Sequence, residues 1–259
     1  MNNPPPNFLP HFGQTRTAVQ RGHAFIAPDG QVETTLPSWK GSMVVTLISP
    51  QMGARFSQYL AHMQPGGEGT PPLSGVERFI YVLAGEVGVT TEADKFDLSA
   101  GGFAFLPADD PHFITAQVEA RLNVFERRYI ASESSERVPI VVGAEAEVAG
   151  EAFLGDGRVT VKRFLPDDAK FDMAVNTMTF KPGATLPFAE THVMEHGLLM
   201  LSGGGIYRLE DNWYPIQTGD VLWMGPYCPQ WFGALGREDA SYLLYKEANR
   251  DVFQFEKES

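Results

Sequence analysis

Cysteine is almost absent from this sequence, which contains only Cys228 among its 259 residues. A single cysteine cannot form an intrachain disulfide, and it also excludes a metal cluster built from several thiolates. Any metal site must therefore use nitrogen and oxygen ligands. The low cysteine content is typical of reducing compartments, so we expect a cytoplasmic protein.

Long apolar runs and positive charge are also scarce. No run approaches the ~20 apolar residues of a membrane span, and the first residues, MNNPPPNFLPHFGQTR, lack the apolar segment of a secretion signal. The chain has 20 Lys and Arg against 32 Asp and Glu, a net charge of −12. Phosphate neutralisation needs clustered Lys and Arg, so we expect neither a nucleic-acid nor a membrane partner and assign the acidic excess to the solvated surface.

Hydrophobic residues make up 43% of the chain, enough for one large or two medium domains. They occur in short runs, such as FIYVL and GFAFLP in the first half and GLLML and VLWMGP in the second. Gly, Pro and Asp separate these runs, and there is almost no helical periodicity. The pattern predicts an all-β barrel or sandwich.

The two halves of the chain repeat one another. QPGG at 64–67 matches KPGA at 181–184, and ERFIYVLAGEV at 77–87 matches EHGLLMLSGGG at 195–205. GGFAFLPADDPHF at 101–113 likewise matches GDVLWMGPYCPQWF at 219–232, so the offset stays at 117 to 118 residues. A duplication of this period indicates two similar domains.

The segment ETHVMEH contains three candidate metal ligands, Glu190, His192 and His196. On a β-strand these even-numbered positions share one face, and Glu195 points to the other. A helix would place the histidines together but carry Glu190 away from them. We therefore predict a strand here, followed by a glycine turn at 202–205 and a second strand in a hairpin, although two such histidines can also be structural.

The wider pattern resembles the two cupin motifs. Glycines frame spaced metal residues, and a Gly-Asp segment then ends in a proline and a fourth polar residue. The usual ligands are His, His and Glu with a later His, whereas this chain has Glu190, His192 and His196 with Gln230. With ETHVMEHG, GIYRLEDNWYPIQTGD and SYLLYKEANRD, this set is similar to the (S)-ureidoglycine aminohydrolases, bicupins of purine catabolism.

The resemblance covers nearly the whole chain and implies a bicupin fold with two tandem barrels. We expect an N-terminal arm at 1–20, a first barrel at 21–132, a connection at 133–158 and a second barrel at 159–259. It also implies a hydrolase acting on a C–N bond of a linear ureido compound, one that releases ammonia from (S)-ureidoglycine to give (S)-ureidoglycolate.

The resemblance implies one Mn²⁺ in the second barrel. The residues themselves leave the ion open, since oxygen donors favour Mn²⁺ whereas imidazoles also suit Zn, Fe or Ni. Gln230 is a weak neutral ligand by itself. Its place in the second motif supports it as the fourth ligand.

Matching the family pocket makes Lys246, Tyr242 and Tyr207 the candidate substrate-binding residues. Lys246 would bind the substrate carboxylate, and Tyr242 would share in catalysis. Glu190 could leave the metal to act as an acid or base. A surface lysine and barrel-filling tyrosines are the plain alternatives. Trp223 and Trp231, beside the second motif, are expected to pack in the core and could also line the pocket.

The first barrel lacks the ligand set. Pro72 to Ser74 stand where Glu190 and His192 should fall, and Arg78 stands opposite His196, so only His112, opposite Gln230, remains. One imidazole cannot hold a catalytic metal, so we expect a structural and assembly role and a buried, satisfied His112. The remaining histidines, His11, His23 and His62, have no partner in any motif.

Other functions remain open at this stage. A cupin dioxygenase or decarboxylase is the main enzymatic alternative, although these normally keep three His and a Glu. A non-enzymatic bicupin that binds a small ligand is another, which loss of metal ligands would support. We also expect a homo-oligomer, because covering sheet edges favours association.

Overall fold

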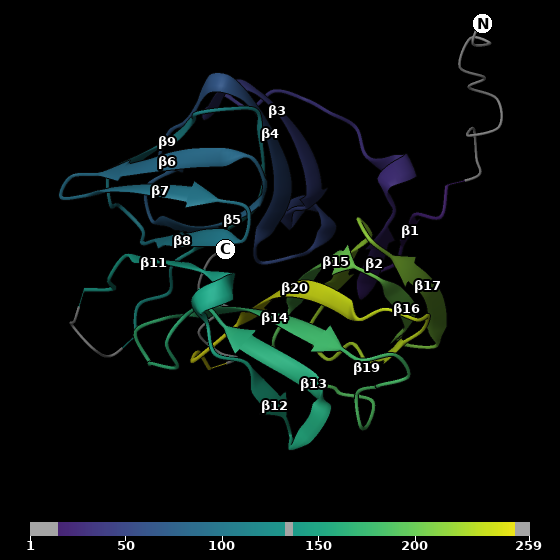
Figure 1. Ribbon diagram of the computed structural model, residues 1–259. Helices are drawn as coiled ribbons and strands as arrows, with labels where there is room; N and C mark the ends of the chain where they lie inside the picture. The colour runs from purple at the N-terminus through teal and green to yellow at the C-terminus, as the bar shows by residue number, and fades with distance from the viewer. Residues whose placement is uncertain (1–14, 133–136, 252–259) are drawn as a thin grey trace, which may run out of the picture.

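The computed structural model describes residues 15–132 and 137–251 and is built almost wholly of β-strands (Figure 1). This confirms the predicted all-β fold with cupin barrels. The described helices are short 3-10 turns, η2 (Pro28–Gly30), η3 (Pro50–Met52) and η4 (Glu145–Glu147). None of them is long or apolar enough to cross a membrane. Residues 1–14, which include most of the predicted arm and His11, lie outside the described residues.

The first barrel is formed by one nine-stranded sheet. Its strand order is β11-β8-β5-β10-β4-β9-β6-β7, with β3 also paired to β4. The bounds are β3 (Trp39–Ile48), β4 (Ser57–Gly69), β5 (Val76–Ala84), β6 (Glu86–Thr91), β7 (Lys95–Ser99), β8 (Gly102–Leu106), β9 (His112–Ala116), β10 (Ala120–Arg128) and β11 (Val141–Ala144).

The second barrel combines an eight-stranded sheet, ordered β1-β2-β18-β15-β20-β14-β13-β12, with a three-stranded sheet, ordered β17-β16-β19. The bounds are β1 (Ala18–Val19), β2 (His23–Ile26), β12 (Glu151–Phe153), β13 (Asp156–Arg163), β14 (Met173–Phe180), β15 (His196–Ser202), β16 (Gly204–Leu209), β17 (Asn212–Gln217), β18 (Val221–Met224), β19 (Gln230–Ala234) and β20 (Ala240–Glu247).

The strand pairing differs from the predicted domain division at both ends of the first barrel. The sequence predicts β2 in the first barrel, but it pairs with β18 of the second, with His23 opposite Met224. Strand β11, assigned to the connection, instead pairs with β8 of the first barrel. Each segment completes a sheet that lies beyond the predicted boundary, because an unpaired edge strand is stabilised by any backbone that can hydrogen-bond to it.

The predicted hairpin after β15 is also absent. Strands β15 and β16 follow each other in sequence but pair with different neighbours in different sheets. Gly203 joins them in the left-handed region at φ +69, and a Cβ there would lie 2.6 Å from the Asp239 carbonyl oxygen. The glycine therefore turns the chain from one sheet of the barrel to the other.

The described residues form three apolar clusters. One lies inside each barrel, and the third contains aromatic residues from both. In this third cluster the Phe56 and Tyr245 rings lie 4.2 Å apart and those of Phe103 and Phe164 lie 4.6 Å apart. Aromatic pairs at such separations contribute about 0.5–1.5 kcal/mol beyond their buried area. The barrels therefore share a core.

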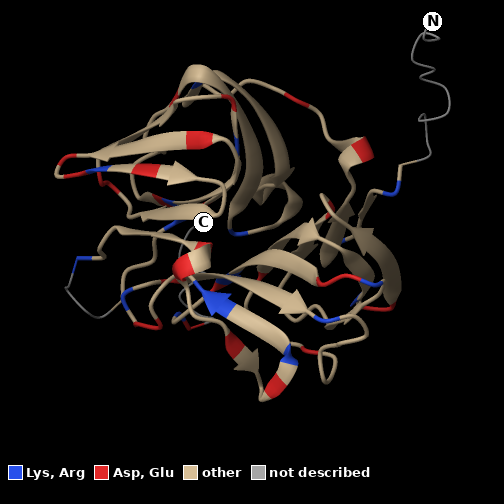
Figure 2. Ribbon diagram, in the orientation of Figure 1, with Lys and Arg blue, Asp and Glu red and all other residues tan. Residues whose placement is uncertain are grey.

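Acidic residues are scattered over loops, strands and 3-10 turns in both halves (Figure 2). This distribution accords with the expected solvated acidic surface.

Candidate metal centre

One cavity of about 500 Å³ opens in the second barrel. All of the predicted site residues line it: Glu190, His192, His196, Tyr207, Gln230, Tyr242 and Lys246. Strands β15, β16, β19 and β20 and the segment before β15 supply these side chains. Pairing of β15 with β20 puts Lys246 opposite His196 and Tyr242 opposite Met200. The sheet therefore brings together residues that lie as far apart in sequence as Glu190 and Lys246.

The prediction that 190–196 forms one strand is wrong. Strand β15 begins only at His196, and Glu190 makes an isolated bridge to Gln230 through two backbone hydrogen bonds of 2.8 and 2.9 Å. His192 lies in the intervening loop, where its carbonyl accepts from the Tyr227 N–H at 2.7 Å. These long-range hydrogen bonds, rather than strand alternation, hold the segment beside the cavity.

The two imidazoles face each other with their Nε2 atoms 3.0 Å apart. His196 donates through Nδ1 to the Tyr245 carbonyl at 3.2 Å, and His192 donates through Nδ1 to the Met194 carbonyl at 3.1 Å. A carbonyl can only accept, so each neutral ring carries its proton on Nδ1 and presents an Nε2 lone pair to the other. Two such lone pairs repel unless a cation lies between them, and carbonyl-oriented histidines are typical of metal ligands.

Burial lowers the pKa of both imidazoles and takes that of His196 to about 3, with the neighbouring His192 as a further cause. A proton is therefore a poor cation for this position near neutral pH. The donor chemistry fits a metal ion.

Gln230 extends this group of donors. Its Nε2 lies 3.0 Å from His192 Nε2, and its Oε1 accepts from the Tyr207 hydroxyl at 3.4 Å. Because amide oxygen and nitrogen are assigned from the surrounding hydrogen bonds, rotation of the amide presents its oxygen to the imidazole side. Gln230 can therefore serve as an oxygen ligand.

Glu190 provides the negative charge of the cavity. Burial raises the pKa of its carboxyl, and the positive charge of Lys246 opposes that rise. Burial also raises the pKa of Tyr207 and Tyr242, and the charge of Glu190 adds to both shifts. Both tyrosines are almost fully buried and remain neutral hydroxyls. The cavity therefore places a carboxylate, an amine and the two tyrosine hydroxyls around the imidazoles.

Glu195 points away from the cavity, as predicted. Its carboxylate accepts from the Trp223 Nε1–H at 3.1 Å and from the Arg55 backbone N–H at 3.1 Å. Arg55 also donates to Glu247 at 2.7 Å through Nε, and to the Val193 carbonyl at 3.2 Å through Nη2. An arginine of the first barrel thus holds the residues next to His192, His196 and Lys246.

The tryptophans pack in the core rather than line the cavity. Trp223 belongs to the aromatic cluster shared by the barrels. Trp231 packs against the interior of the second barrel and donates to the Leu186 carbonyl at 2.8 Å.

Outside the sequence motifs, sequence reasoning missed Arg163 and Asn176 of the cavity wall. They lie directly opposite each other on β13 and β14, and Asn176 also faces Leu244 of β20. Neither belongs to a motif, and their position depends on the pairing of three strands. Only the sheet register could reveal them.

In the first barrel, His112 is buried and satisfied, as predicted. It donates to the Asp110 carbonyl at 2.8 Å and accepts from Arg78 at 3.2 Å. His23, which has no partner in any sequence motif, is also buried, and its Nε2 lies 2.9 Å from the Tyr214 hydroxyl.

Comparison with known proteins identifies the family of the chain. The model of the cupin domain family matches residues 59–125, in the first barrel. An (S)-ureidoglycine aminohydrolase of Arabidopsis thaliana is 40% identical over 92% of this chain and 80% of its own length. An (S)-ureidoglycine aminohydrolase of Escherichia coli is 36% identical over 92% of this chain and 93% of its own length.

Solved structures show the same architecture. Protein Ylba from E. coli has a TM-score of 0.82 and 33% identity, covering 92% of this chain and 96% of that one. Bacillus subtilis oxalate decarboxylase shares the fold with a TM-score of 0.67 at 13% identity, covering 88% of this chain and 78% of that one. From the identity and coverage of its relatives, the chain belongs to the (S)-ureidoglycine aminohydrolase family of hydrolases, within the cupin fold.

Proposed function

We propose that the chain hydrolyses (S)-ureidoglycine to (S)-ureidoglycolate and ammonia, using one Mn²⁺ held by Glu190, His192, His196 and Gln230. The observation that carries this proposal is the cavity in which paired imidazole lone pairs meet the predicted substrate-binding residues. The names of the relatives supply the substrate.

The donor set supports a divalent ion with open coordination positions. Carboxylate and amide oxygens suit Mn²⁺, although two imidazoles bind Zn²⁺ more tightly in the general order of affinities. When bound, the ion supplies a Lewis acid and a template that fixes the orientation of the substrate.

The side chains of the cavity provide the remaining functions. The central carbon of the substrate carries an amino group, a ureido group and a carboxylate. Lys246 lines the cavity and offers an ammonium group to that carboxylate. The neutral hydroxyls of Tyr207 and Tyr242 donate to Gln230 and to the Met178 sulfur in this structure, and they would turn to donate to bound substrate. Three contacts of fixed geometry present one face of the carbon to water.

The reaction exchanges one bond at the central carbon. A C–N bond to the amino group breaks and a C–O bond from water forms, while the departing amine gains a proton and leaves as ammonia. Glu190 is the carboxylate of the cavity wall and takes part in this proton transfer.

The testing experiment measures ammonia release from freshly generated (S)-ureidoglycine by metal-stripped protein, with and without added Mn²⁺. Release well above the spontaneous rate, dependent on Mn²⁺, would establish reaction and cofactor together. Zn²⁺, Fe²⁺ and Ni²⁺ in parallel would test the choice of ion. If no ammonia is released although metal binding is measured, the site would instead be assigned to another cupin reaction or to ligand binding.

The protein is further proposed to act in the cytoplasm as a homo-oligomer. The single cysteine supports a reducing compartment. Strands β7 and β12 end the paths of their sheets, and covering such edges favours association. Light scattering tests the assembly, and a monomeric mass would refute it.

A further inference from the structure

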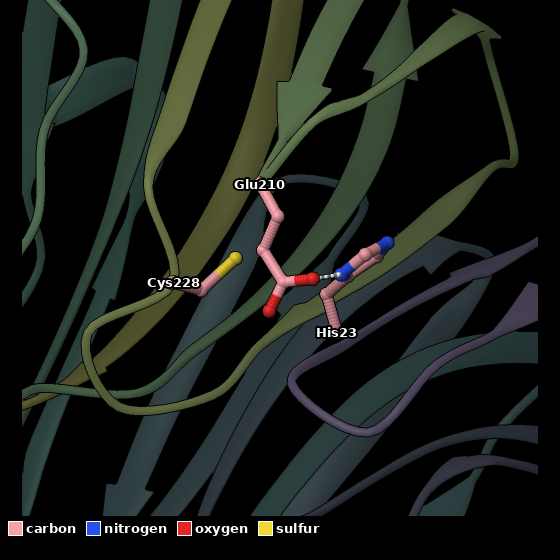
Figure 3. A group of neighbouring side chains, drawn as sticks. All are labelled: His23, Glu210 and Cys228. Carbon is pink, nitrogen blue, oxygen red and sulfur yellow. Dashed lines mark ion pairs between the residues drawn. The ribbon is translucent and has the colours of Figure 1, made fainter.

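A second group of donors lies outside the cavity just described. His23 begins β2, Glu210 lies in the turn between β16 and β17, and Cys228 lies between β18 and β19. Their donor atoms all lie within 4.8 Å of one another. Figure 3 shows the Glu210 carboxylate between the Cys228 thiol and the His23 ring. Three segments distant in sequence therefore place nitrogen, oxygen and sulfur at one point.

The His23 ring is fully buried and oriented toward this group. Its Nε2 lies 2.9 Å from the Tyr214 hydroxyl, whereas Nδ1 has no hydrogen-bond partner and lies 3.4 Å from a Glu210 carboxylate oxygen. Because the Tyr214 hydroxyl both donates and accepts, the ring has two available tautomers. With the proton on Nδ1 it points an N–H at the Glu210 carboxylate, and with the proton on Nε2 it presents an Nδ1 lone pair that a cation would share with that carboxylate. A buried imidazole nitrogen without a partner is costly unless a ligand satisfies it.

We propose that His23, Glu210 and Cys228 form a zinc-binding site. Zn²⁺ bonds of about 2.0–2.3 Å in a tetrahedron separate neighbouring donors by roughly 3.3–3.8 Å, which accommodates the 3.4 Å between His23 and Glu210. Sulfur with imidazole favours zinc over the harder Mn²⁺. The Glu210 side chain is 44% exposed, so an ion can enter and water can complete the shell.

This site would fasten the N-terminal strand to the second barrel. Strand β2 reaches that barrel by pairing with β18, and Cys228 lies two positions before the predicted ligand Gln230. Bound zinc therefore connects the chain before the first barrel to the loop that leads into β19. A ligand that binds only the folded state raises its stability.

The test uses Co²⁺ as a spectroscopic probe on the full-length, metal-stripped protein. Cys228 is the only cysteine, so a thiolate-to-cobalt charge-transfer band in the near ultraviolet can arise only at this site. The expected result is a band that grows with Co²⁺ and disappears when Zn²⁺ is added. Co²⁺ binding without the band would leave an ordinary His23–Glu210 ion pair and overturn the proposal.

Variants localise the signal. Cys228→Ala should abolish the band. His23→Gln should weaken the cobalt affinity that is measured from this band about 10–100-fold. His62→Gln is the matched control, because His62 pairs with Glu33 at 2.8 Å on the first barrel. An equal loss in the control would overturn the assignment.

Alkylation of Cys228 in the wild-type protein provides a test that requires no variant to fold. Zinc should slow the reaction at least tenfold, and an unchanged rate would contradict the proposal. Both measurements are independent of turnover, so a failed ammonia assay would leave this site untouched.

Discussion

The two barrels use equivalent positions for opposite purposes. Arg78 in the first barrel corresponds to His196 in the second, and His112 corresponds to Gln230. Arg78 is fully buried and donates to His112 at 3.2 Å, to Glu126 at 2.7 Å and to the Thr70 carbonyl at 2.8 Å. A guanidinium thus occupies the interior of the first barrel.

A second pair of equivalent positions, Glu126 and Lys246, carries opposite charges in the two barrels. Glu126 lies opposite Arg78 in the sheet, as Lys246 lies opposite His196. The first barrel therefore neutralises a fixed cation with an acid, whereas the second places an amine beside neutral imidazoles. The first barrel therefore pairs its buried cation internally, whereas the proposed metal and anionic substrate would enter the second.

Equivalent positions of the two barrels also carry the charged contacts at the interface between them. Glu195 and Glu247 of the second barrel bind Arg55 of the first. At the repeat-related positions, Arg127 of the first barrel donates to the carbonyl of Asp172 of the second at 2.8 Å, beside Glu77. Each barrel therefore supplies a charged residue that completes a buried network of the other.

The largest effect is expected from removing a ligand of the second barrel. His196→Ala should abolish metal binding and lower ammonia release by about 10²–10³-fold or more, because electrostatic stabilisation of the reaction is lost. Glu190→Ala should do the same. Metal analysis and steady-state kinetics measure both. His112→Ala, at the position equivalent to Gln230, is the control that should keep full metal content, and a loss there would break the comparison.

Lys246→Ala should retain the metal and lower kcat/KM by about 10–10²-fold, since one charge-assisted hydrogen bond to the substrate is worth roughly 1.5–3 kcal/mol. Kinetics on ureidoglycine, with metal content measured in parallel, test this. Lys162→Ala provides a lysine control, because its Nζ donates to the Glu145 carbonyl at 2.8 Å. Wild-type kinetics for Lys246→Ala would return this lysine to a surface role.

Arg55→Ala tests whether the first barrel positions the metal-binding segment. We expect metal affinity to fall about 10–100-fold, as when partners that orient ligands are removed. Unfolding should also become easier, because Glu195 and Glu247 are almost fully buried and lose their counter-charge. Arg55→Lys should rescue part of the affinity.

Arg16→Ala supplies the control for this experiment, since Arg16 also binds a buried carboxylate, Asp220, at 2.6 Å. A loss of stability alone, with unchanged metal affinity, would limit Arg55 to a structural role.

The smallest effect concerns Glu77, which corresponds to Glu195. Burial, with Asp172 as a further cause, raises the pKa of Glu77 well above its usual range. A raised folded-state pKa contributes stability below the unfolded value of about 4.3, and this contribution is lost as pH rises through the folded value. Glu77→Gln should reduce this fall in the free energy of unfolding with rising pH by about 1–2 kcal/mol. Denaturant unfolding from pH 4 upward measures it, and parallel curves for both proteins would contradict the assignment.

Much of the architecture could be predicted from the sequence. The duplication, the short apolar runs between glycine turns and the unequal ligand sets of the two halves are local patterns, and each depends on residue type and spacing. The candidate ligands could be named because the motif that relates Glu190, His192, His196 and Gln230 is recognisable from the order and spacing of residues in the sequence. Their convergence on one cavity confirms that placement, whereas their role as ligands remains a prediction.

Only the tertiary structure decided the rest. The segment carrying Glu190 and His192 is held by backbone bonds to Gln230 and Tyr227 instead of strand alternation. The pairing of β2 with β18 and the contact of Arg55 with Glu247 join residues far apart in the chain. The sequence by itself determined which donors exist and how they repeat, since those are covalent facts. Their partners were decided by sheet pairing and barrel packing, because long-range hydrogen bonds and burial depend on the whole fold.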